Sequence, residues 1–570
     1  MKGINMEVKQ IYKQTIGIVL LGFLVSGCGN DKDTVSSNLP EIGDSCPTIM
    51  DEKLFADVDT LEKFVQVGPD LAQLRSTGSL AHKQLVDWIE LEAKKIPNMQ
   101  IRSDSYEIQR WQPMIVAENG KGRSLSRSGQ LSVNGKDIAI AGAVPYSLGT
   151  TLTGNNGQLV FLASNQAITE EHRGKIIVRE IPTVQDPVYV NQVAPPYAFL
   201  FQFAKYLSPS LNDLKTQRYD KPFLAGELMN KDLIAAGKVG AAGVILGFDV
   251  PRDQIKDYFD PHNGLHYRLP AVFLGADEFA EVKALATSNS QAKIVVQAER
   301  DTTTTRNLIA TLPGLSHEKI VFVANTDGNT WVQENGVSGL LALAQYFAKL
   351  PLKCRQKTYE FAFNTGHLHM SKEGTFRYME ELNEEYKDGK VSFVFAVEHL
   401  GTREIVAKPR KDLGWGRTLE FSGRAEPQAW FVAEDHLLMQ KVAIEAAQRH
   451  KLPAVLISTG QDMPNIQRSP KQCDFGGIGN ASHQNLIPTM ATISGPWSLW
   501  APSFGRDAID FSLMRKQLLA IGDSVLALQN HTKAEIDGPY TEWRVASNQG
   551  KLVCSHSINS GVEDAPNTAN

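Results

Sequence analysis

The second half of the chain alternates short apolar runs with amphipathic segments, and this alternation is what most limits the folds open to it. The pattern predicts strands at residues 357–363, 391–397 and 454–457 and helices at 374–382, 436–450 and 512–528. Such alternation is typical of a mostly parallel sheet with helices on both faces. We therefore expect a three-layer α/β domain with its functional residues just after the carboxyl ends of the strands.

The composition fits a large globular protein. Hydrophobic residues make up 42% of the 570 residues, and the formal net charge is -5. These values argue against a disordered chain and against the basic surface of a nucleic-acid-binding protein, so we expect no nucleic-acid partner. At roughly 100–200 residues per folding unit, the length predicts two to four units.

Residues 320–350 have the layout of a strand, a loop and a helix that can carry a metal site. The apolar run 320–324 leads into Asn325-Thr326-Asp327, and the loop then passes Asn335 before Ser338-Gly339 opens an apolar-faced helix. This order resembles family 28 of the zinc peptidases, the aminopeptidase Y, glutamate carboxypeptidase II and transferrin receptor type. There the strand ends in His-x-Asp and the loop in Asp-x-x-Ser-Gly. The resemblance thus places the first His ligand on Asn325 and the bridging Asp on Asn335.

Neutral amides at these two positions change the expected metal chemistry. A co-catalytic zinc pair needs carboxylate or imidazole ligands, and an amide oxygen is a poor substitute. The resemblance makes Asp327 the residue that would orient the missing His. The neighbouring Glu334 is either a displaced metal ligand or a solvated surface charge.

The other ligand positions of the family are altered too. Its Glu-Glu pair, general base then ligand, falls on His367 and Leu368 or on Leu368 and His369, depending on the anchor residue. A His can act as a general base, and the alternative is one packed and one solvated imidazole.

The last two positions fall later in the chain. Glu398, followed by His399, takes the place of an Asp ligand and is the best-preserved candidate. The last His falls on Trp500, whose indole only donates a hydrogen bond, with His483 as a nearby alternative.

The chain between the opening helices and the metal strand resembles a protease-associated (PA) domain. The resemblance rests on Gly240-Ala241-Ala242-Gly243 before a buried strand and on Pro270-Ala271-Val272 in a later one. The expected segments are a signal peptide at 1–27, a tether at 28–45, a peptidase-like domain at 46–128 and 306–535, a β-rich PA-like insert at 129–305, and a C-terminal extension at 536–570.

The N-terminus predicts export and a lipid anchor. A basic segment (residues 2–13) precedes an apolar run (15–25), and Val25-Ser26-Gly27-Cys28 resembles a bacterial lipobox. Cys28 is then the lipidated first residue and the lipid bilayer a partner. Because Gly29 follows it, the resemblance favours the outer membrane where a cell has one. An ordinary signal peptide or an uncleaved anchor is the alternative, although a spanning helix needs about 20 apolar residues.

Four cysteines remain in the exported part, Cys46, Cys354, Cys473 and Cys554. Four cysteines allow three disulfide pairings. We expect Cys46 to pair with Cys554, which would tie together the two ends of the globular part.

Two functions from different classes fit these observations. The favoured one is a non-peptidase without a cofactor, which binds a peptide, glycan or protein in an altered cleft. The residues expected to line that cleft, unless the Trp side chains are core, are Trp331, His367, His369, Glu398, His399, Trp497 and Trp500. The alternative is a metallohydrolase with a single metal, zinc being the candidate. Its ligands would be Glu398, one of His367, His369 or His399, and Asp327 or Glu334.

Overall fold

The computed structural model describes residues 46–552 except for 67–72, 182–203, 217–220, 222–225, 262–265, 370–371, 413, 460–474 and 476. Cys28, Cys473 and Cys554 lie outside the described residues. In this described part of the chain, no helix combines the length and the hydropathy needed to cross a membrane.

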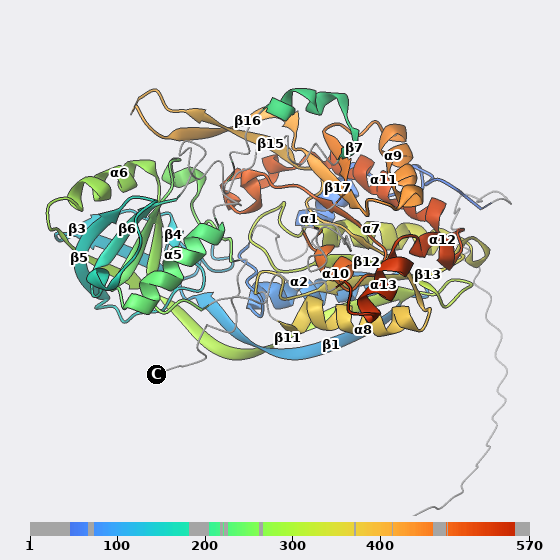
Figure 1. The fold of residues 1–570 in the computed structure, drawn as a ribbon, viewed down its shortest axis with the longest axis horizontal. Helices are drawn as coiled ribbons and strands as arrows, with labels where there is room; N and C mark the ends of the chain where they lie inside the picture. Colours follow the sequence, from blue (N-terminus) through green and yellow to red (C-terminus); the bar gives the residue numbers. More distant parts are fainter. Residues whose placement is uncertain are drawn as a thin grey trace, which may run out of the picture. The chain divides into compact units, whose positions relative to one another are not determined.

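The larger of the two main sheets has nine strands (Figure 1). Their order is β1 (Gln100–Pro113), β11 (Ala298–Leu312), β13 (Thr358–Asn364), β12 (Lys319–Asn325), β14 (Val391–Ala396), β19 (Thr489–Ile493), β17 (Gln428–Val432), β18 (Val455–Ser458) and β7 (Ala204–Leu207). The four central strands β13, β12, β14 and β19 are parallel, while the pairings of β1, β11 and β7 are antiparallel. The predicted parallel sheet is therefore its centre, and its edges are mixed.

Helices cover both faces of this sheet, and its central strands are therefore buried on both sides. Along β12, Val321 and Val323 pack into one cluster with α8 (Arg377–Lys387). Phe322 points to the opposite face, where its ring centroid lies 5.9 Å from that of Phe347 in α7 (Gly336–Lys349). The remaining helices of this part are α1 (Val58–Gln66), α2 (Leu80–Lys94), α9 (Leu437–Arg449), α10 (Asn480–Gln484), α11 (Phe511–Leu528), α12 (Lys533–Asp537) and α13 (Tyr540–Asn548). The expected three-layer α/β domain is confirmed.

A second sheet of eight strands lies between β1 and β11 in the chain. Its order is β3 (Lys136–Ile138), β2 (Gly129–Val133), β10 (Gln291–Val296), β5 (Asn155–Leu162), β6 (Ile176–Glu180), β8 (Gly243–Gly247), β9 (Ala271–Leu274) and β4 (Gly142–Ala143), with helices α5 (Gly226–Val239) and α6 (Ala276–Leu285). It has its own hydrophobic core, and the expectation that this part of the chain forms a separate insert stays a prediction. Its resemblance to a PA domain stays a prediction.

Two predicted boundaries need correction. The segment with β7 and the following 3-10 helix (Pro209–Thr216) was assigned to the insert, but β7 pairs with β18, so this segment returns to the nine-stranded sheet. The predicted C-terminal extension is also partly wrong. Tyr540 and Trp543 of α13 are buried in a cluster with Ala433 and Leu486, so this helix completes the main domain.

An ion pair and a backbone hydrogen bond join the part of the chain with the second sheet to the main domain. The guanidinium of Arg417, in the hairpin β15 (Arg403–Pro409) and β16 (Arg417–Ala425), forms a buried ion pair with Asp249 after β8. The N–H of Phe259 donates to the carbonyl of Trp500 at 3.0 Å. The segment after β8 therefore packs against Trp500, one of the residues at the predicted ligand positions.

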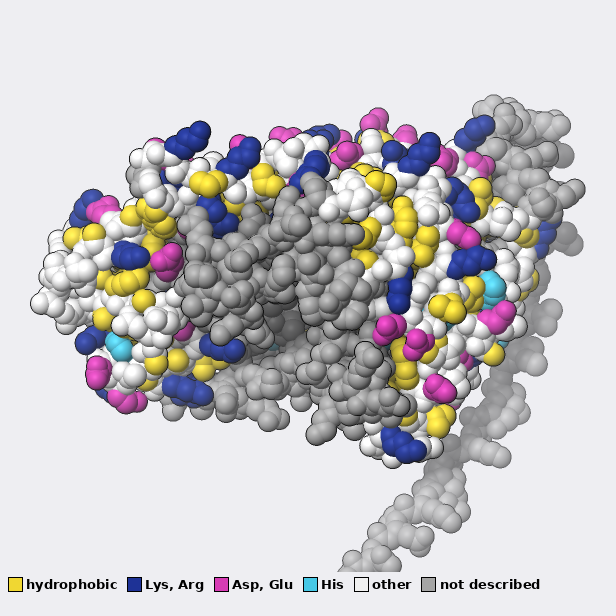
Figure 2. Space-filling view, turned by 45° about the horizontal axis from the view of Figure 1, so that its top comes forward, with side chains coloured by type: hydrophobic (Ala, Val, Ile, Leu, Met, Phe, Trp, Pro, Cys, Tyr) yellow, Lys and Arg dark blue, Asp and Glu magenta, His cyan; other side chains and the backbone are white. Residues whose placement is uncertain are grey.

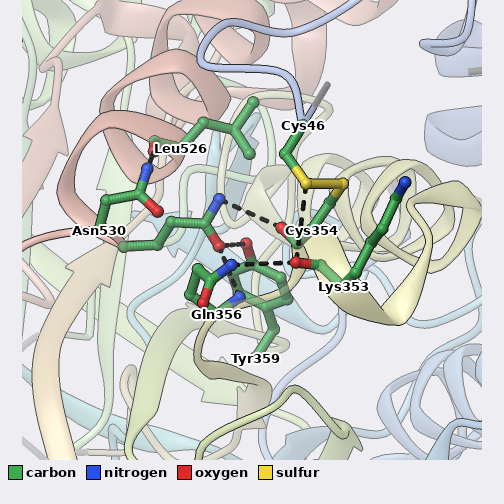
Figure 3. Close-up of a disulfide and its surroundings, with 8 residues drawn as sticks. Cys46, Lys353, Cys354, Gln356, Tyr359, Leu526 and Asn530 are labelled. Atoms are coloured by element: carbon green, nitrogen blue, oxygen red, sulfur yellow. Dashed lines mark hydrogen bonds between the residues drawn. A yellow bond between two sulfur atoms is a disulfide. The ribbon is translucent and has the colours of Figure 1, made fainter. Parts of the chain in front are cut away.

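The expected Cys46–Cys554 disulfide is wrong. Cys46 instead pairs with Cys354 after α7, with 5.1 Å between their Cα atoms (Figure 3). Cys354 is fully buried, and its carbonyl accepts a hydrogen bond from Gln529, whose side chain also accepts one from the hydroxyl of Tyr359. The disulfide therefore fixes the first described residue to the base of the main domain.

The charged side chains of the described surface are intermixed. Figure 2 shows lysine and arginine side chains alternating with acidic and hydrophobic ones across one face. This distribution agrees with the small net charge of -5.

Candidate metal centre

The residues singled out in the sequence meet at the carboxyl ends of three neighbouring strands. The order β13-β12-β14 brings the ends of these strands side by side, so that Asn364, Asn325 and the loop with Glu398 are adjacent. All three residues are buried. The parallel sheet therefore builds the centre where the alternation predicted it.

Asn335 is held by the backbone of Leu400. Its Nδ2 donates to the Leu400 carbonyl at 2.9 Å, and its Oδ1 accepts from the Leu400 N–H at 2.8 Å. The next residue, Gly336, begins α7 so close to the sheet that a Cβ there would lie 2.0 Å from the Val397 carbonyl. Asn335 thus fastens the start of α7 to the loop after β14, and both of its polar atoms are used.

Asn325 and Asp327 are also engaged within the protein. Asn325 Oδ1 accepts from the hydroxyl of Thr375, and its Nδ2 is buried without a hydrogen-bond partner. One oxygen of Asp327 accepts from the hydroxyl of Thr77 and from the backbone N–H of Leu368, each at 2.7 Å. The family would use this carboxylate to orient an imidazole, whereas here it orients a turn and a backbone amide.

Three side chains nevertheless point donor atoms at one another. Glu334, Glu398 and His399 are at most 4% exposed, and one donor atom of each lies within 4.8 Å of the others. The alternative of a solvated Glu334 is therefore excluded. Among the described residues, this is the one cluster of three such groups able to hold a metal ion.

Burial dominates the electrostatics of the two carboxyls. It raises the pKa of Glu398 to about 8, against a hydrogen bond from the Ile478 N–H that lowers it. Burial also raises the pKa of Glu334 well above its usual range, as does the charge of Glu398, while Arg75 opposes the shift. Burial therefore favours the neutral form of both carboxyls.

His399 is oriented for ligation. Its Nδ1 lies 2.5 Å from the Ser494 carbonyl and 3.4 Å from the Ser494 N–H, and the shorter contact assigns the proton to Nδ1. The Nε2 lone pair then lies 3.5 Å from an oxygen of Glu398. A metal-binding His usually has this arrangement, with its other ring nitrogen donating to a carbonyl.

The two other histidines separate. His367 Nε2 lies 3.8 Å from Glu334 Oε1, next to the three donors. His369 Nε2 lies 2.7 Å from the Gln109 carbonyl, and its ring packs against Tyr146 and His266. Of the two predicted catalytic histidines, His367 therefore lies beside the centre, while His369 is engaged by the Gln109 backbone.

The tryptophans are mainly core. Trp497 and Trp500 are 1% and 3% exposed, which matches the core alternative, while Trp331 is partly exposed. His483 does not replace Trp500, because its ring stacks on Phe475 with 4.1 Å between centroids and its Nδ1 bonds the Tyr540 hydroxyl.

Three supporting residues were missed from the sequence. Thr77 binds Asp327, Ser494 orients His399, and the buried guanidinium of Arg75 donates to the Gln333 carbonyl beside Glu334. Arg75 and Thr77 belong to the Arg-Ser-Thr-Gly-Ser turn that breaks the opening helices. Their place at the centre depends on contacts more than 240 residues apart in sequence, which local patterns do not encode.

Comparison with solved structures places the fold. A zinc aminopeptidase from Bacillus subtilis aligns with a TM-score of 0.54 at 14% identity, covering 86% of this chain and 98% of that one. A peptidase M28 precursor from Shewanella amazonensis aligns with a TM-score of 0.55 at 15% identity, covering 84% and 93%. No protein-family model matches the sequence, and no curated protein matches it. The chain thus has the fold of the family 28 zinc peptidases.

Proposed function

From this peptidase fold with an altered centre, we propose that the chain is a lipid-anchored envelope protein that binds a ligand or partner and does not cleave peptides through a zinc pair. The observation that carries the proposal is the pairing of Asn335 with Leu400. At the bridging position, both polar atoms of the amide face a backbone and none is left for two cations.

Charge reinforces this argument. Two cations about 3.5–4 Å apart, the spacing of two-metal sites, repel strongly unless an anion lies between them. Asn335 is neutral, and so are Asn325 and Trp500 at two further ligand positions. The residues present therefore do not fit a co-catalytic zinc pair.

The general-base position is also weak. If Leu368 holds it, no base is present, because an apolar side chain cannot accept a proton. His369 would then hold the ligand position of the pair, but its imidazole is turned to the Gln109 carbonyl. Only His367, beside Glu334, lies where a base could act.

That position of His367 favours a second candidate function, a hydrolase with one metal. His367 would supply the base, and Glu334 and Glu398 the carboxylate ligands, with zinc as the candidate metal. This is the rearranged metallopeptidase foreseen in the sequence.

The cellular setting is proposed from the lipobox alone. Lipidation of Cys28 would attach the protein to the bilayer of the cell envelope, at the outer membrane where one is present. A peptide, a glycan or another protein is the proposed ligand, for which a surface-anchored binding module is suited.

The test compares the full-length wild type with Glu398→Ala and Glu334→Ala in a peptide-release assay. Each protein is loaded with zinc and incubated with a mixed peptide pool, and released amino acids are quantified. We expect the wild type to release no more than the variants. Zinc-dependent release by the wild type that is lost in both variants would establish the hydrolase instead.

A further inference from the structure

The three facing donors come from two loops whose backbones hold uncommon conformations. Glu334 has φ 62°, and His399 has φ 54°. Left-handed conformations at residues other than glycine are uncommon and persist where the surroundings enforce them, often at binding sites. Both loops thus adopt strained turns at the residues that supply ligand atoms.

The cluster also contains buried polar atoms without a partner. Glu334 Oε2 is buried without a hydrogen bond, and so are Asp327 Oδ1 and Asn325 Nδ2 nearby in the chain. An unsatisfied buried polar atom is costly enough that a native fold rarely keeps one without a bound ion or water. Glu334 is 2% exposed, so bulk solvent does not satisfy it.

The spacing of the donors suits one cation. A tetrahedral ion with bonds of about 2.1 Å has ligand atoms about 3.4 Å apart. Glu398 Oε2 and His399 Nε2 are 3.5 Å apart, and every pair of donors in the cluster lies within 4.8 Å. Two ligands are therefore already close to the required separation, and the third lies at most about 1.4 Å beyond it.

We infer that Glu334, Glu398 and His399 bind a single divalent transition-metal cation, Zn²⁺ or Mn²⁺, as a buried site that stabilises the junction of α7 with the loop after β14. Imidazole favours transition metals over Mg²⁺ and Ca²⁺, which prefer oxygen ligands alone. Two carboxylates offset the charge of one divalent cation. The burial that raises the pKa of both carboxyls is then offset by the bound charge.

This site does not depend on the proposed binding function, and it shares the ligands Glu334 and Glu398 with the one-metal hydrolase that is the second candidate. A cation held by three buried protein ligands contributes to folding whether or not a substrate reaches it. The ligand set also departs from the family's pattern, because Glu334 precedes the family's bridging position and His399 follows its Asp position.

The test measures binding and stability, without an activity assay. The full-length chain is purified in detergent, stripped with a chelator and titrated by calorimetry with ZnCl₂, MnCl₂, MgCl₂ and CaCl₂, and its thermal midpoint is followed with and without each salt. We expect one equivalent of Zn²⁺ or Mn²⁺, a higher midpoint, and at least 100-fold weaker binding of Mg²⁺ and Ca²⁺.

Glu334→Gln is the decisive variant because it keeps the size of the side chain. Without metal it should melt at or above the metal-free wild type, since it removes a buried carboxyl, and it should bind Zn²⁺ at least 100-fold more weakly. The matched control is Glu404→Gln, which changes a buried Glu that is paired with Arg424, and it should keep one equivalent.

Three results would overturn the site. They are the absence of binding to the folded wild type, two equivalents of Zn²⁺, and unchanged affinity in Glu334→Gln. Loss of the site leaves the proposed binding function standing, whereas peptide release in the separate assay overturns that function and leaves the cation site intact.

Discussion

Replacing Asn335 by the family's Asp should destabilise this protein instead of restoring a zinc pair. In Asn335→Asp, one carboxylate oxygen can still accept from the Leu400 N–H. The other oxygen replaces Nδ2, which in the wild type donates to the Leu400 carbonyl at 2.9 Å, so two acceptors then face each other. That carbonyl loses its partner, which costs about 1–3 kcal/mol. The new carboxylate is buried and directly follows Glu334 in the chain. Because its charge is uncompensated, the expected loss in the free energy of unfolding rises to about 3–5 kcal/mol.

The assay is equilibrium urea unfolding followed by tryptophan fluorescence at pH 7, with and without zinc. Asn119→Asp is the control, because Asn119 is exposed and its Oδ1 accepts from the Lys121 N–H, as a carboxylate would. The control should stay within about 0.5 kcal/mol of the wild type. If Asn335→Asp is as stable as the wild type and binds two equivalents of zinc, the structural role given to Asn335 is refuted.

Three further predictions concern the anchor, the disulfide and acid stability. Cys28→Ser should move the protein from the membrane fraction to the soluble fraction while leaving it folded, and recovery in salt-washed membranes at the wild-type level would contradict lipidation. Cys354→Ser should lower the free energy of unfolding by about 2–5 kcal/mol, and a non-reducing peptide map should contain Cys46 joined to Cys354. Burial lowers the pKa of His483 to about 3, so the folded state binds fewer protons than the unfolded state between about pH 3 and 6.5, and stability falls on acidification. His483→Phe should reduce this slope by about 1.4 kcal/mol per pH unit, and equal slopes in urea unfolding between pH 4 and 6 would count against it.

The fold could be predicted because its main signals are local. Strands such as β12 and β14 are continuous apolar runs, and α7 is apolar on nearly every side, so periodicity and length identify them. Motif spacing also placed Asn325 at the end of β12, Glu398 just after β14, and Asn335 at the start of α7. The three-layer arrangement follows from these elements and their order.

What sequence could not supply were pairings across long stretches of chain. β7 has four residues, and its partner β18 lies about 250 residues later, so no local pattern shows that the chain returns to the main sheet there. The disulfide is a similar case, since four cysteines allow three pairings of equal merit before folding. Asn335 pairs with the backbone of Leu400, and because every residue except proline offers the same backbone groups, no sequence motif could reveal this partner.

The Cys46–Cys354 disulfide has a mechanical consequence. If the chain is held at Cys28, a pull on its N-terminal end reaches the described part of the chain at Cys46. That pull would pass through the disulfide into Cys354 in the main domain. The hydrogen bonds that seat residues 50 and 51, from Met50 to Asp523 and from Asp51 to Tyr346, would be shielded from that force. The disulfide would thus allow a tethered domain to withstand a pulling force without unfolding from its N-terminal end. Reduction of the disulfide would transfer the force to those hydrogen bonds.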